Sequence, residues 1–393
     1  MDAGHSYLLS YRPKPLPDEL FSSWLIRVAH AQGLKLQTFC HMMWPEAMIW
    51  NRDCDRCASP ELRSSLADMT GVAVARADAT LLTSYEGILF RRSVKNGHTK
   101  WILPLGVFHR VRRRNGLQYC PQCLADATPY FRRAWRLSLY TLCERHQCLL
   151  RDECPHCKRP VHPHRGEMGD RKRMAPMGNE FCWMCGGDLR DVGLGKPIPE
   201  SLLSLQRYHS SLLKRDIGVS SSGDSCLYFD CLAHILQLVT SKRPRMARFR
   251  ELLSQGSGVE ITSIEPKASC PLHFDAFSTY ERAQILQAVA WLFEDWPGRF
   301  RALIILGKLR SSDLSGEHKQ LPEWFSSAIR RPMRYKANLL PGHRPFRGNP
   351  ESSEFEDGFG PSEFLRSKLV PADYTETKTR IGADLAREGA HGK

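Results

Sequence analysis

The sequence has few of the features that place a chain in or across a membrane. Its apolar runs are short, Ala302–Leu306 among the longest, whereas a membrane-spanning helix needs about 20 apolar residues. Residues 1–11 lack the basic start, apolar stretch and cleavage site of a secretory signal. We therefore expect a soluble intracellular chain, in which the 14 cysteines stay reduced. That expectation argues against a disulfide framework and favours metal binding.

Acidic residues are scarce relative to basic ones. The 393 residues include 56 Lys and Arg against 42 Asp and Glu, which gives a net charge of +14 at pH 7. Such a surplus favours polyanionic partners such as DNA, RNA or anionic membranes. No acidic residue occurs between residues 87 and 125, where eight basic residues stand: Arg91, Arg92, Lys95, Lys100, Arg110, Arg112, Arg113 and Arg114.

Signatures of catalysis are also missing. The sequence contains no Walker-type or dinucleotide-binding glycine loop and no evident carboxylate triad of a transposase. We therefore expect a protein that is not an enzyme, with no catalytic residues and no organic cofactor. A zinc-dependent nuclease or hydrolase is the rival that this expectation opposes.

Apolar residues at helical spacing predict helices at both ends of the chain. The first is expected to follow an Asp18-Glu19 cap, to bury Phe21 and Trp24 in a core, and to end at Gly33. Further helices are expected within residues 39–50, 62–69, 202–213, 227–239, 246–253 and 280–293.

The helical patterns predict a mainly α fold. The cysteine pairs described below predict tandem zinc-ribbon-like modules in its middle. The expected parts are an N-terminal helical region (1–85), a basic connecting segment (86–118), tandem zinc-binding modules (119–195), a helical C-terminal domain (196–335) and a largely disordered tail (336–393).

Paired cysteines and a histidine in the middle of the chain have the spacing of metal ligands. Two residues between ligands allow a tight turn to aim both side chains at one tetrahedral ion. We expect two zinc sites, the first from Cys120, Cys123, Cys143 and His146, and the second from Cys154, Cys157, Cys182 and Cys185. Four protein ligands leave no open position, so both sites are expected to be structural.

Other interpretations of the cysteines stay open at this stage. The two sites could be crossed, or a histidine could replace a cysteine, the candidates being His156, His162 and His164. A further CxxC pair, Cys54 and Cys57, has Cys40 and His41 upstream, but its spacing resembles no compact site. Four more cysteines are expected to be small core residues: Cys148, Cys226, Cys231 and Cys270.

Two groups of arginines are candidates for contact with a nucleic-acid backbone. Arg110, Arg112, Arg113 and Arg114 precede the first ligand pair, with no acid nearby. Arg132, Arg133 and Arg136 alternate with Phe131 and Trp135, which we expect to lie in the core while the arginines are either interfacial or simply solvated. Weaker candidates are Lys242, Arg243, Arg245, Arg248, Arg250, Arg330, Arg331, Arg334 and Lys336.

The order of these motifs resembles one family. Pro15-Leu-Pro-Asp-Glu-Leu-Phe-Ser-Ser-Trp-Leu-Ile-Arg-Val-Ala29 is similar to the opening of the TniQ family of transposition proteins, which includes the TnsD target selectors. The later segments Tyr119-Cys-Pro-Gln-Cys-Leu124, Tyr130-Phe-Arg-Arg-Ala-Trp-Arg136 and Cys154-Pro-His-Cys157 resemble the same family. The resemblance covers residues 11–187 and is weak in the region after Cys185.

The resemblance implies a target-selection adaptor of a prokaryotic, cytoplasmic transposition system. Members recognise a DNA target or an RNA-guided CRISPR effector complex and recruit the AAA+ ATPase that activates the transposase. The resemblance also suggests a homodimer, and it points to the N-terminal region, with Arg12 and Lys14, as the part that contacts the ATPase. The alternative is a zinc-containing, sequence-specific DNA-binding regulator that acts without a transposase.

Overall fold

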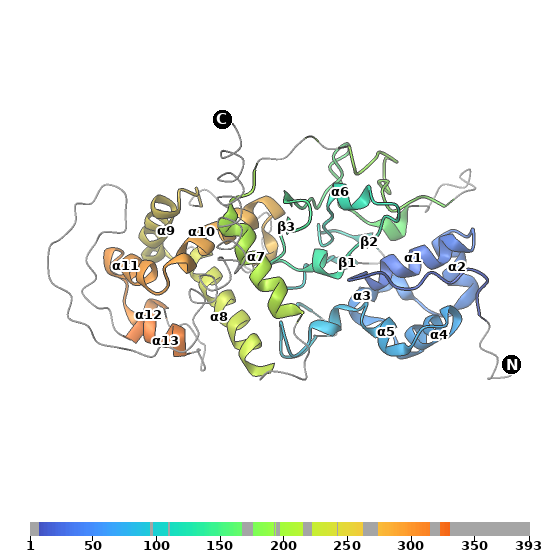
Figure 1. Ribbon diagram of the computed structural model, residues 1–393, viewed down its shortest axis with the longest axis horizontal. Coiled ribbons are helices and arrows are strands. Elements are labelled where there is room, and N and C mark those ends of the chain that lie inside the picture. Colours follow the sequence, from blue (N-terminus) through green and yellow to red (C-terminus); the bar gives the residue numbers. More distant parts are fainter. Residues whose placement is uncertain are drawn as a thin grey trace, which may run out of the picture.

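The computed structural model describes residues 8–94, 97–108, 111–166, 176–191, 193, 197–214, 222–241, 243–261, 274–314 and 323–330. The molecule is elongated, with an N-terminal helical unit at one end, the C-terminal helices at the other, and the cysteine-rich region between them (Figure 1). No helix among the described residues is long and apolar enough to span a bilayer. The expected tail, residues 336–393, lies outside the described residues.

The N-terminal unit has a hydrophobic core of its own. Its helices are α1 (Phe21–Ala31), α2 (Leu36–Met43), α3 (Cys54–Cys57), α4 (Pro60–Thr70) and α5 (Val74–Asp78). Phe21 and Trp24 are completely buried in this core, as their helical spacing predicts. Gly33, with a φ of 70°, follows the end of α1, and Gly71, with a φ of 66°, ends α4. Both glycines adopt the left-handed conformation that other residues resist.

The predicted Asp18-Glu19 cap of α1 is wrong. Leu20 holds the N-cap position, and no side chain caps this helix. Asp18 instead forms an ion pair with Arg133, with an Oδ1 to Nε distance of 3.1 Å. Glu19 pairs with Arg27 at 2.6 Å and accepts the Leu16 backbone N–H. The two carboxylates thus hold separate parts of the chain together.

Short strands, helices and turns make up the middle of the chain. They comprise the hairpin of β1 (Val107–Phe108) and β2 (Val111–Arg112), the helix α6 (Pro121–Leu124), the hairpin of β3 (Leu142–Cys143) and β4 (Cys148–Leu149), and 3-10 turns at Arg133–Arg136 and Pro163–Arg165. Two earlier 3-10 turns, Ile49–Asn51 and Leu82–Tyr85, lie between α2 and α3 and after α5. The fold is therefore mainly helical with few strands, as predicted.

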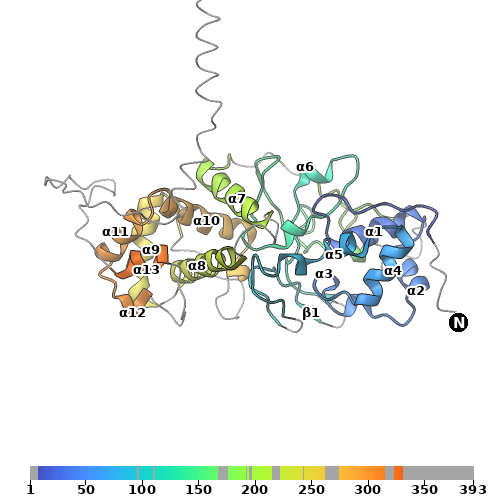
Figure 2. The ribbon, with the colours of Figure 1, turned by 60° about the horizontal axis from the view of Figure 1, so that its bottom comes forward.

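The C-terminal helices are α7 (Glu200–Leu213), α8 (Ser222–Thr240), α9 (Pro244–Ser257), α10 (Thr279–Glu294), α11 (Gly298–Leu306), α12 (Ser311–Leu314) and α13 (Glu323–Arg330). The first four contain the helices expected from sequence. Helices α11, α12 and α13 gather at the end opposite the N-terminal unit (Figure 2). A capping box of Ser278 and Glu281 begins α10.

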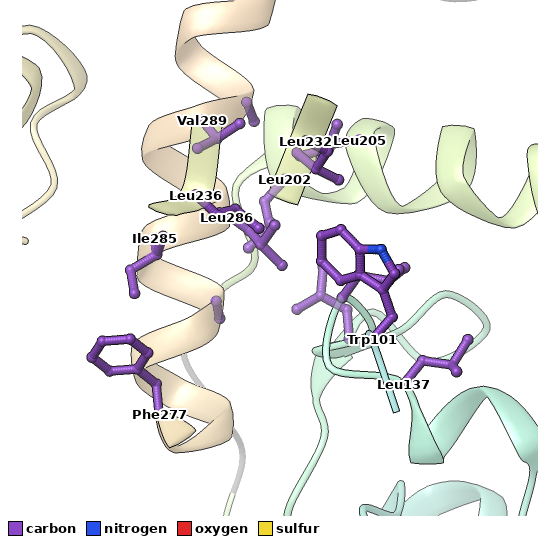
Figure 3. Packing of buried hydrophobic residues seen from close by; sticks show 14 of the residues in the cluster. Trp101, Leu137, Leu202, Leu205, Leu232, Leu236, Phe277, Ile285, Leu286 and Val289 are labelled. Carbon is purple, nitrogen blue, oxygen red and sulfur yellow. The ribbon is translucent and has the colours of Figure 1, made fainter. Parts of the chain in front are cut away.

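One continuous core joins the cysteine-rich region to these helices. Trp101 and Leu137 from the middle region face leucines of α7, α8 and α10 in this core (Figure 3). Arg282 of α10 crosses the same boundary, since its fully buried guanidinium donates to the Ser138 carbonyl and to Gln118 Oε1. The cysteine-rich region is thus packed against the C-terminal helices.

Candidate metal centres and nucleic-acid interface

The first predicted ligand set comes together around one point. A knuckle formed by α6 supplies Cys120 and Cys123, and the β3–β4 hairpin supplies Cys143 and His146. The four donor atoms all lie within 4.8 Å of one another. The Nδ1 atom of His146 is 3.4 Å from Cys120 Sγ and 3.3 Å from Cys123 Sγ. We call this set the first centre.

The second predicted ligand set also converges. Cys154 Sγ lies 3.8 Å from Cys185 Sγ, and Cys157 Sγ lies 3.7 Å from Cys182 Sγ. A tight turn aims each pair of sulfurs, because the backbone N–H of Cys154 donates to the Arg159 carbonyl and that of Cys182 donates to the Gly187 carbonyl. We call this set the second centre. The sequential pairing predicted from spacing is therefore the arrangement in the structure.

The spacing of the donors fits a metal ion. Tetrahedral ligands at about 2.0–2.3 Å from one ion lie roughly 3.3–3.8 Å apart. The observed separations within the two centres, 3.3 to 3.8 Å, match that range closely. Three thiolates with an imidazole, and four thiolates, are donor sets typical of structural sites. Each centre can therefore hold one ion.

The histidines considered as substitute ligands lie elsewhere. His162 is buried against the Trp183 ring, and its Nε2 lies 3.2 Å from the Arg112 carbonyl. Burial lowers the pKa of His162 to about 4. His164 is buried against Trp50, and His156 contacts the Asp188 carbonyl. Neither centre includes any of the three.

Cys148 is a sulfur near the first centre that the spacing argument missed. Its Sγ lies 3.6 Å from Cys120 Sγ, and it is half-buried rather than enclosed in the core. The only signal in the sequence was its place two residues after His146. The further CxxC pair, Cys54 and Cys57, belongs to neither ligand group that the described residues form.

Arg136 is fully buried in an ion-pair cluster, so we do not propose it as a nucleic-acid contact. Its guanidinium lies 2.6 Å from Asp53 Oδ2 and 3.0 Å from Asp55 Oδ2. Asp55 in turn accepts the backbone N–H of Ser22 at 2.8 Å. Asp55 lies in α3 and Asp53 directly precedes it. The segment Cys54–Cys57 therefore helps to join the N-terminal unit to the region around the first centre, to which Arg136 belongs.

Arg112 is also buried, and its guanidinium contacts the His164 imidazole and lies over the Trp50 ring. Burial lowers the pKa of this arginine, while Asp53 and Asp55 act in the opposite direction. A side chain held in this way cannot reach a DNA phosphate without unpacking. We therefore do not propose Arg112 as an interfacial residue either.

The remaining arginine candidates are more accessible. Arg133 is half-buried and pairs with Asp18, whereas Arg132 lies 4.6 Å above the Tyr130 ring. Arg113 is exposed and Arg114 is half-buried, just after the β1–β2 hairpin. Arg110 lies outside the described residues. Phe131 and Trp135 are buried, as expected.

The weaker basic candidates divide in the same way. Arg243 is exposed at the start of α9, whereas Arg245 pairs with Asp313 and Arg248 pairs with Glu251. Arg250 is half-buried. The others, Lys242, Arg331, Arg334 and Lys336, lie outside the described residues, and so does the side chain of Arg330.

Comparison with known proteins gives one family. Residues 10–150 match the model of the TniQ family. The match begins in the segment that precedes α1 and ends at Leu150, directly after β4. The matched region thus contains the N-terminal unit, the Arg136 cluster and the first centre, while the second centre follows it. No curated protein matches the chain. Residues 10–150 of this chain are therefore similar to the TniQ family.

Proposed function

We propose that this protein is a non-enzymatic target-selection adaptor of a transposition system. It links a DNA target, or an RNA-guided effector complex, to the AAA+ ATPase that controls the transposase. The observation that carries this proposal is the TniQ match over residues 10–150, because that family is associated with transposition. The two centres support a scaffold role, since each consists of four protein donors.

We propose zinc as the metal in both centres. Zinc favours tetrahedral sites of thiolate and imidazole, and the donor spacings fit such sites. In this role the metal supplies rigidity to short loops that have little core of their own. Measurement of the metal content of the purified chain tests the assignment, with two zinc ions per chain as the expected result.

The N-terminal unit is the proposed contact for the ATPase. Large apolar side chains are exposed on this unit: Leu8, Tyr11, Met42, Met48 and Val74. Arg12 and Lys14 are exposed beside them. The segment that carries Tyr11, Arg12 and Lys14 is held by its backbone, because Trp24 Nε1 donates to the Pro13 carbonyl and Arg27 donates to that of Lys14. An ordered segment with exposed side chains suits recognition of a partner.

A pull-down with a AAA+ transposition ATPase tests the contact. Deletion of residues 1–16 would remove backbone acceptors that α1 uses, so substitution is the sharper experiment. Arg12→Glu with Lys14→Glu is expected to reduce ATPase capture, while Arg243→Glu with Arg310→Glu, the same charge change at the far end, leaves it intact. Equal capture by both variants would exclude this surface.

Nucleic-acid binding is proposed for the exposed arginine Arg113, together with Arg114 and Arg132. Affinity for duplex DNA is expected to fall with salt, and Arg113→Glu should reduce the slope of log affinity against log salt by about 1. Arg310→Glu, at an exposed arginine that is not among the candidate contacts, is the matched control. Sequence-specific DNA binding without ATPase capture would instead support the alternative, a zinc-containing regulator that acts without a transposase.

A further inference from the structure

A fifth donor side chain, Cys148, lies next to the first centre but outside the four donors that are all within 4.8 Å of one another. The Sγ atom of Cys148 lies 3.6 Å from Cys120 Sγ, which equals the separation of the ligand pair Cys123 and Cys143. The second centre has no such additional sulfur at a ligand-like distance among the described residues. The first centre therefore has one more donor beside it than a tetrahedral ion requires.

The β3–β4 hairpin fixes the position of the fifth donor. Cys143 and Cys148 are direct partners in the antiparallel register, and His146 lies in the turn between them. Side chains of paired residues project from the same face of a hairpin. The hairpin thus places the thiols of Cys143 and Cys148, one from each strand, and the His146 imidazole from its turn near the first centre.

Cys148 differs from the other cysteines of the first centre in its access to solvent. Cys120, Cys123 and Cys143 are buried, whereas Cys148 is half-buried. It lines a groove of about 820 Å³ between α6 and the β3–β4 hairpin on one side and α7 and α10 on the other. The Cys148 thiol is therefore open to the groove, unlike the three buried sulfurs.

We propose that Cys148 is a reserve ligand of the first centre, which replaces His146 and converts the donor set from three sulfurs and one nitrogen to four sulfurs. The thiol loses its proton to solvent as its sulfur binds the ion, and the imidazole leaves. No electrons are transferred. Because thiolate is the softer donor, the exchange favours thiophilic ions such as Cd²⁺ and is available to Zn²⁺ as well.

The test measures metal per chain in the full-length protein after exposure to a mild chelator. The wild type is expected to retain two ions, which first establishes that both centres are loaded. His146→Ala and His146→Gln are expected to retain two ions as well, because Cys148 takes the vacant position. Combining either with Cys148→Ser should reduce the count to one, while Cys148→Ser alone keeps two.

Cobalt substitution identifies the donor directly. Sulfur-to-cobalt charge-transfer absorption should increase in His146→Ala relative to the wild type, and alkylation of Cys148 from the groove should slow. Loss of one ion from both His146 variants, or failure of both to fold, would overturn the proposal. Retention of two ions by the double variant would overturn it too. Cys185→Ala, in a centre without a reserve sulfur, serves as the control that loses its ion.

Discussion

The two centres have almost the same ligand spacing in the sequence but different surroundings in the fold. All three cysteines of the first centre are buried, and its module lies between the N-terminal unit and the C-terminal helices. In the second centre Cys185 is exposed, and its neighbour Met184 is 55% exposed. The family match includes the first centre and ends before the second.

The same ligand spacing therefore gives similar local geometry in the two centres. It does not determine how each centre packs against the rest of the molecule. Helix α7 contacts the first centre's hairpin directly, because the Gln206 side chain accepts the backbone N–H groups of Thr141 and Leu142. The first centre therefore stabilises contacts on which both ends of the molecule depend. In the second centre Cys154 and Cys182 are buried in the same core, whereas Cys157 is half-buried and Cys185 is exposed.

Loss of a ligand in the first centre should have the largest effect. Cys123→Ala combined with Cys148→Ser leaves three donors in a site buried in the main core. Structural zinc contributes on the order of 10 kcal/mol in small domains. That exceeds or equals the whole stability of most proteins. We expect this variant to be largely unfolded by circular dichroism. A cooperative unfolding transition near that of the wild type would contradict this account of the first centre.

Arg136→Met should have the next largest effect. The substitution leaves Asp53 and Asp55 buried without their cation, for which we expect a loss of about 3–5 kcal/mol. Urea unfolding with the metal content held constant measures it. The triple variant Arg136→Met, Asp53→Asn, Asp55→Asn is the control, and it should recover part of the loss. A small effect of the single variant would show that the first centre holds the N-terminal unit without this cluster.

The sequence predicted the parts of this comparison that depend on local spacing. Both ligand sets follow from CxxC and CxxH pairs, and α4, α7 and α10 follow from helical periodicity. The partners of Arg136 were not predictable, because Asp53 and Asp55 precede it by more than 80 residues in sequence. Basic patterning alone therefore placed Arg112 and Arg136 on the surface, and tertiary packing buried them.

The misassigned Asp18 has the same origin. An acidic residue just before an apolar helix is a sound signal for a cap, but Arg133 competes for the carboxylate from a distant segment. Cys148 was assigned to the core because nothing in the spacing of CxxC pairs includes it. Only the register of the β3–β4 hairpin shows that it lies opposite Cys143.

Loss of a ligand in the second centre should be milder. Cys182→Ala is expected to release one ion and to lower the free energy of unfolding by less than the first-centre variant, because Cys157 and Cys185 of the second centre are half-buried and exposed. Calorimetry together with metal analysis measures both. Global unfolding of this variant would remove the distinction between the two centres.

The smallest expected effect is on the pH dependence of the free energy of unfolding, through His209 of α7. His209 of α7 is buried, with Nε2 3.0 Å from the Tyr228 hydroxyl, and burial lowers its pKa to about 3. The unfolded chain binds a proton near pH 6.5, so folding excludes that proton and stability falls as the pH decreases from about 6.5 toward 3. The wild type should lose about 1 kcal/mol between pH 6.5 and 5.5 from this group. His209→Gln should lack that component, while Cys182→Ala, which leaves His209 and its contact with Tyr228 in place, should retain it. The free energy of unfolding is measured by urea unfolding at constant zinc. If its dependence on pH is the same in His209→Gln as in the wild type, His209 is not the source of the acid sensitivity.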